Sequence, residues 1–185
     1  MAKTDITRIM VREHQLILRM IALLEKNTEQ MARGRFRDWQ FFLDAVDFIR
    51  NYADRFHHAK EEDVLFKALI ANGMPAENSP VAAMLMAHDE GRAHVRGMEE
   101  AAEKALAGGE GQVPVIAEHA RGYIRLLRDH IDKEDNILYP LAERVLPEEG
   151  RDEMARRYQE AAALTPGLEE KYRRLVEKYE ARAAA

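Results

Sequence analysis

Apolar residues recur along the chain at spacings of three and four, and alternating apolar and polar positions are absent. Such spacing places the apolar side chains on one face of an α-helix. The pattern therefore predicts an all-α protein built from long amphipathic helices. The predicted helices span residues 4–33, 38–71, 79–106 and 114–146, followed by two weaker segments at about 148–163 and 168–183.

Residues that start and stop helices lie at the ends of these segments. Gly34 follows the first helix, Asp38 can cap the second, and Ser79 followed by Pro80 can open the third. Because the connections are short, neighbouring helices should pack antiparallel. We expect an up-down-up-down four-helix bundle at residues 1–147. Residues 148–185 should form a C-terminal helical extension, packed on the bundle or used in self-association.

Composition narrows the classes of function. Lys and Arg number 28 against 33 Asp and Glu, a net charge of −5, so no basic field points to nucleic acid. The chain has no cysteine, which excludes disulfides and thiolate metal sites. The N-terminus lacks the pattern of a signal peptide, and no apolar stretch is long enough to span a membrane. These features predict a cytoplasmic protein with neither nucleic acid nor membrane as a partner.

Two segments of the second and fourth helices repeat one another. Aligned without gaps, His57 matches His130 and Glu61 matches Glu134. Residues four apart share a helix face, and here that face is otherwise apolar. A buried carboxylate without a partner costs several kcal/mol, so two inward His–Glu pairs require a shared cation.

The first and third helices each add a histidine on the inner face, His14 and His88. Four imidazoles and two carboxylates without thiolate suit iron, manganese or zinc. The simplest arrangement has two metals bridged by the two glutamates, with two histidines on each. Such a site keeps coordination positions open for a small ligand.

At these positions the chain resembles the hemerythrin-like, or HHE cation-binding, family over roughly residues 10–145. The resemblance implies a non-haem centre of two iron ions, with manganese or zinc as alternatives, that binds dioxygen or reacts with peroxide or nitric oxide. Its metal ligands would be His14, His57, Glu61, His88, His130 and Glu134. No separate catalytic residue is predicted, and a homodimer through the C-terminal extension is compatible with it.

Two positions depart from oxygen-carrying hemerythrin. Its fifth histidine, four residues after the ligand in the third helix, is replaced here by Arg92. The second motif has Glu134, whereas oxygen-carrying hemerythrin has an aspartate one residue further on, a position that Asp135 occupies here. A centre poor in histidine favours redox reactivity or sensing over reversible oxygen carriage. An iron- or oxygen-responsive regulatory module is therefore the alternative function.

Other residues are alternatives to this ligand set. His58 and Glu62 repeat the four-residue spacing but are turned about 100° from His57 and Glu61. The repeat favours His57, because Ile131 stands where His58 would be matched. Tyr123 lies two turns before His130 and could approach the metals. The two remaining histidines are expected away from the site, His94 on the surface and His119 as a packed polar residue.

Overall fold

The computed structural model describes residues 4–184, apart from the side chain of residue 184. Between these limits the chain folds into helices and contains no strand, which confirms the all-α prediction. The elements are α1 (Arg8–Ala32), α2 (Trp39–Phe48), η1 (Ile49–His58), η2 (Glu61–Leu65), α3 (Phe66–Ala71), α4 (Pro80–Leu106), α5 (Gln112–Lys133), η3 (Glu134–Leu138), α6 (Tyr139–Val145), α7 (Arg151–Ala163) and α8 (Leu168–Ala184).

Two of the predicted helices change type along their length. The helix predicted at 38–71 consists of α2, η1, η2 and α3, in which η1 and η2 are π-helical. The helix predicted at 114–146 consists of α5, π-helical η3 and α6. Its start lies at Gln112, two residues before Pro114, and the first helix starts at Arg8 rather than Thr4. Hydrophobic spacing alone did not reveal the π-helical turns.

The helix ends follow the local sequence signals. The Asp38 side chain accepts a hydrogen bond from the Phe41 amide at 3.3 Å, and the Ser79 hydroxyl accepts one from the Ala82 amide at 3.2 Å. Gly34 adopts φ of 71°, the left-handed conformation that glycine reaches without steric cost. The Asp38 and Ser79 side chains thus satisfy amides that an isolated helix start leaves free, and the Gly34 amide donates to the Met31 carbonyl at the end of α1.

A buried polar layer divides the hydrophobic core into two clusters. In each of the four long helical segments, residues of one cluster precede the layer and residues of the other follow it. In the first helix, for example, Met10 belongs to one cluster and Leu16 to the other, with His14 between them. The layer comprises Glu13, His14, His57, His58, Lys60, Glu61, His88, His130 and Glu134.

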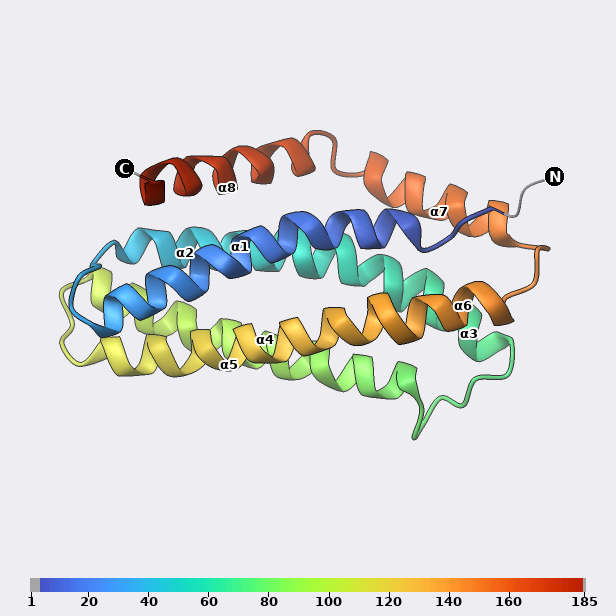
Figure 1. The fold of residues 1–185 in the computed structure, drawn as a ribbon, viewed down its shortest axis with the longest axis horizontal. Coiled ribbons are helices and arrows are strands. Elements are labelled where there is room, and N and C mark those ends of the chain that lie inside the picture. The colour runs from blue at the N-terminus through green and yellow to red at the C-terminus, as the bar shows by residue number, and fades with distance from the viewer. Residues whose placement is uncertain (1–3, 185) are drawn as a thin grey trace.

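The two C-terminal helices lie against one side of the bundle (Figure 1). Tyr172 and Tyr179 of α8 are buried in the cluster that includes α2, while Tyr158 of α7 joins the other cluster. Arg151 is 1% exposed, and its guanidinium donates to the backbone carbonyls of Thr4 and Leu146. These contacts fix α7 and α8 on the helices that carry the polar layer.

From residue 4 to residue 184, none of the helices combines the length and the hydrophobicity needed to cross a membrane.

Candidate metal centre

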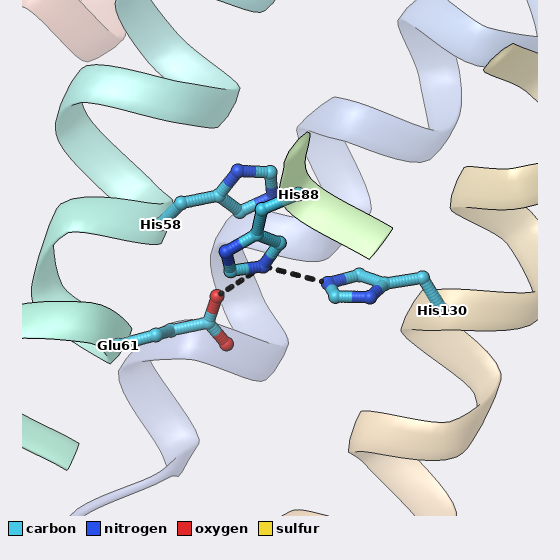
Figure 2. A group of neighbouring side chains, drawn as sticks. All are labelled: His58, Glu61, His88 and His130. Carbon is cyan, nitrogen blue, oxygen red and sulfur yellow. Dashed lines mark hydrogen bonds and ion pairs between the residues drawn. The ribbon is translucent and has the colours of Figure 1, made fainter. Parts of the chain in front are cut away.

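The polar layer contains two groups of side chains whose ligand atoms all lie within 4.8 Å of one another. The first cluster is His14, His57, Glu61 and Glu134, and the second cluster is His58, Glu61, His88 and His130. Figure 2 shows the second cluster, with residues from three helical segments pointing toward one another. The structure thus brings together the six ligands predicted from sequence and adds His58.

Glu61 and Glu134 connect the two clusters. Glu61 Oε2 lies 3.8 Å from His57 Nε2 and 3.5 Å from His88 Nε2. Glu134 reaches both sides with different oxygens, Oε2 at 3.4 Å from His14 Nε2 and Oε1 at 3.1 Å from His130 Nε2. Each carboxylate therefore lies where it could bridge two cations.

The two rings of the first cluster face each other through their Nε2 atoms. His14 Nδ1 lies 2.8 Å from Asp135 Oδ1, and His57 Nδ1 lies 2.9 Å from Glu13 Oε2. A ring that donates through Nδ1 carries a lone pair on Nε2, and the two Nε2 atoms are only 2.9 Å apart. A proton or a metal ion must therefore lie between them.

Without a metal, a proton carried by His14 can take this place. Burial opposes charge on His14, but hydrogen bonding to Asp135 and the nearby Glu134 raises its pKa to about 9. Burial lowers the pKa of His57 well below its usual value, so this partner is neutral and can accept the proton. The proton would have to leave when a metal binds, because metal ligands must be deprotonated.

The two glutamates fit bound cations better than they fit any described side chain. Glu61 Oε2 and both oxygens of Glu134 are buried and accept no well-formed hydrogen bond from residues 4–184. Burial and the charge of Glu134 raise the pKa of Glu61 well above its usual value. Burial also acts to raise the pKa of Glu134, but the imidazoles of His130 and His14 outweigh it and lower that pKa. Metal ions would satisfy these oxygens directly.

Outer carboxylates orient four of the five histidines in the clusters, all except His130. Besides Asp135 and Glu13, Glu62 Oε1 lies 2.7 Å from His88 Nδ1, and Asp54 Oδ1 lies 3.4 Å from His58 Nδ1. Metal-binding histidines commonly hold a carboxylate in this way, which fixes the ring and its tautomer. Glu62 and Asp135, which the sequence left as alternative ligands, lie in this outer position and in neither cluster.

The position of His58 differs from the expectation that it turns away from the site. It is buried, and its ring stacks on His88 with centroids 3.8 Å apart and planes 10° apart. Glu61 lies four residues after His57 and three after His58, and both spacings bring side chains together on a helix. Glu61 can therefore have a histidine on each side. His57 and His58 can both face the site, so the sequence alternatives do not exclude each other.

All three π-helical segments meet the polar layer. η1 ends at His58, η2 begins at Glu61, and η3 begins at Glu134. π-Helical turns are rare and occur frequently at functional sites. Their positions here indicate that the backbone departs from α-helical geometry to place these ligands.

A cavity of about 320 Å³ opens beside the second cluster. Its lining includes His58, His88 and His130, together with Tyr123 and Arg92. The Tyr123 hydroxyl is buried and has no hydrogen-bond partner among the described residues. Arg92 belongs to neither cluster and instead contacts the outer carboxylates, Asp54 at 2.6 Å and Glu62 at 2.8 Å.

Besides Asp54, three residues at or next to the clusters were not predicted from sequence. The Tyr139 hydroxyl donates to Glu61, and its ring stacks on His14 with centroids 5.7 Å apart. Lys60 is buried and forms an ion pair with Glu13, the residue that orients His57. Lys60 and Tyr139 lie inside the two repeated segments, residues 57–66 and 130–139, and this repeat was the sequence signal that could have identified them. For Glu13 the sequence contained no signal except that this residue is adjacent to His14.

Comparison with known proteins identifies one family. The sequence model of the family described as Hemerythrin HHE cation binding domain matches residues 5–142 of this chain. The matched range contains all residues of both clusters. No curated protein and no solved structure matches the chain.

Proposed function

Because the chain belongs to the hemerythrin HHE cation-binding family, we propose that its polar layer binds two iron ions and that this pair binds or reduces a small oxidant or diatomic gas. Dioxygen, peroxide and nitric oxide are the candidate ligands. The observation that carries the proposal is the pair of adjacent clusters that share Glu61. Manganese and zinc suit the same donor atoms, so the identity of the metal is part of the test.

The ligand assignment follows from the two clusters. His14 and His57 would bind one metal, and His58, His88 and His130 would bind the other. Glu61 and Glu134 would bridge them, in an up-down-up-down four-helix bundle whose segments each contribute to the layer. The ligand set then contains five histidines. The fifth is His58 of the second helix, since the position of the fifth histidine of oxygen-carrying hemerythrin is occupied here by Arg92.

When bound, a ferrous pair supplies two electrons, enough with two protons to convert one hydrogen peroxide molecule to two waters. The chain's own residues set the conditions for that chemistry. Burial keeps His58 and His88 neutral by lowering their pKa values, which leaves their lone pairs available. The Tyr139 hydroxyl holds Glu61 in place through its hydrogen bond.

The cavity beside the second cluster gives a small ligand its route to the centre. Its inner wall includes the three histidines of that cluster, and Ile49 and Leu127 add apolar surface. A diatomic gas or peroxide is far smaller than 320 Å³. The unpartnered Tyr123 hydroxyl can donate a hydrogen bond to a ligand in this space.

A second candidate function, sensing, has one observation in its favour. Arg157 of α7 donates to the backbone carbonyl of Asp63 at 3.0 Å, within the π-helical η2 segment that begins at Glu61. Metal binding at Glu61 could therefore be transmitted to the C-terminal helices and to a partner or second copy held there. A change of oligomeric state on iron loading, without turnover of peroxide or nitric oxide, would favour this function over the first.

The test begins with protein purified without chelator, analysed for metal content and by absorption spectroscopy. We expect two irons per chain and the spectrum of an oxo-bridged ferric pair. Glu61→Ala should lose both irons, whereas His57→Ala and His58→Ala should each weaken one position. Asp63→Ala is the matched control, because Asp63 is exposed and its side chain forms its ion pair with Lys67, away from both clusters. Protein that folds and takes up no iron would refute the proposal, and retention of both irons by His58→Ala would remove His58 from the ligand set.

A further inference from the structure

A second sequence repeat lies outside the polar layer. His94-Val95-Arg96-Gly97 in α4 and His119-Ala120-Arg121-Gly122 in α5 share the order histidine, apolar residue, arginine, glycine. α4 and α5 pack side by side and are joined only by residues 107–111, so they run in opposite directions. The two tetrapeptides therefore face each other across this helix pair.

Each histidine of the repeat lies over the glycine of the other helix. A Cβ atom at Gly97 would be 2.2 Å from His119 Nε2, and one at Gly122 would be 2.3 Å from His94 Cε1. Any other residue at either glycine would displace the opposite ring. The repeated His-x-x-Gly spacing thus builds a reciprocal pocket that holds both imidazoles.

The two rings present the same nitrogen to each other. His94 Nδ1 and His119 Nδ1 are 3.4 Å apart, longer than a good N–H···N hydrogen bond, and the ring planes meet at 65°. A tetrahedral ion with metal–nitrogen bonds of about 2.0–2.1 Å requires two nitrogens about 3.3–3.4 Å apart. The observed spacing therefore equals that of two ligands on one tetrahedral ion.

The surroundings suit a cation from solvent. The His94 side chain is 25% exposed, so an ion can reach the pair and waters can complete its coordination. Glu90 Oε1 lies 4.0 Å from His94 Nε2 and adds negative charge on the far side of that ring. Burial and the neighbouring His119 lower the pKa of His94, which favours the neutral, coordinating form.

We propose that His94 and His119 form a second metal site, in which their Nδ1 atoms bind one divalent late transition-metal ion such as Zn²⁺, Ni²⁺ or Cu²⁺. The other five of the seven histidines lie in the two buried clusters, and the chain has no cysteine. The site lies between α4 and α5 at the surface of the bundle.

The experiment titrates the protein, with its buried centre already loaded with iron, with Zn²⁺ in a calorimeter. We expect one additional Zn²⁺ per chain, with the iron content unchanged afterwards. His94→Gln and His119→Gln should each weaken this binding by at least about tenfold, because one ligand remains. Absence of an additional Zn²⁺, or equal binding by the variant with both substitutions, would overturn the proposal.

Two further variants separate metal binding from a general surface effect. Gly97→Ala keeps both histidines but displaces the His119 ring, so it should weaken Zn²⁺ binding while circular dichroism still shows a helical protein. Glu100→Gln removes an exposed charge on the same helix and should leave binding unchanged. Full affinity in a folded Gly97→Ala variant would show that the reciprocal pocket does not form the site.

Discussion

In the first cluster, each of the two histidines has one ring nitrogen next to a carboxylate and the other next to its partner histidine. The outer carboxylate fixes the tautomer, so it controls affinity without touching the metal. Asp135→Asn should therefore weaken retention of one metal by about 10–100-fold, measured by competition with a chelator. Asp132→Asn is the matched control, because Asp132 is exposed and its carboxylate accepts from Asn136 rather than from a histidine of the clusters. Equal retention in both variants would mean that Asp135 does not orient His14.

The Tyr123 hydroxyl, which has no partner among the described residues, leads to a second prediction about a single substitution. A buried hydroxyl without a partner destabilises a protein by roughly 1–3 kcal/mol, so Tyr123→Phe should leave the free protein as stable or more stable. If the hydroxyl donates to a ligand in the cavity, the same change should slow the reaction with peroxide several-fold. Stopped-flow kinetics of the iron-loaded protein measure this rate.

Tyr158→Phe is the control for that experiment. Tyr158 also has a buried hydroxyl with no partner among residues 4–184, but it does not line the cavity. Its replacement should affect stability in the same direction and leave the peroxide rate unchanged. An unaltered rate in Tyr123→Phe would place the ligand elsewhere.

At the scale of helices, two carboxylates of α2 attach α8: Asp47 accepts from the Tyr172 hydroxyl at 2.9 Å, and Asp44 binds further along the helix. Asp44 Oδ2 accepts from the Tyr179 hydroxyl at 2.6 Å and lies 3.5 Å from Lys178 Nζ. Burial acts to raise the pKa of Asp44, but the Tyr179 hydrogen bond and the other partners outweigh it and lower that pKa. A depressed folded-state pKa gives stability that is present above the unfolded value and lost as pH falls through the folded one.

The resulting prediction compares wild type with Asp44→Asn, both without metal, in thermal melts from pH 7 to pH 3. Wild type should be the more stable protein at pH 7, and the difference should shrink as pH falls below about 4, where Asp becomes protonated. Using metal-free protein removes the separate effect of acid on the buried centre. A difference that grows toward low pH would show that the Asp44 contact is not the cause.

At the scale of the whole molecule, the polar layer interrupts the core in all four long helical segments. A metal pair that binds only the native state stabilises it by about 4 kcal/mol at a concentration of 1,000 times Kd. For a chain of this length, that corresponds to a Tm higher by roughly 8–16 °C. Differential scanning calorimetry of metal-free and iron-loaded protein measures the shift, and Glu61→Ala should show none on iron addition. Equal Tm values for the two wild-type forms would count against a buried metal centre.

The sequence by itself determined the helices and the chemistry of the layer. Helix ends depend on local signals such as Asp38 and Ser79, and the recurrence of apolar residues marks the buried faces. The His57–Glu61 and His130–Glu134 pairs could be recognised because a four-residue step keeps two side chains on one face. These inferences need only neighbours along the same helix, which is why sequence sufficed.

Only the tertiary structure decided which further residues reach the centre. His58 lies against His88 of another helix, Glu13 orients a histidine of the second helix, and Tyr139 donates to Glu61. The crossing of His94 and His119 over opposite glycines likewise depends on how α4 packs against α5. Such contacts are set by the relative rotation and height of neighbouring helices, and spacing within one helix carries no record of either.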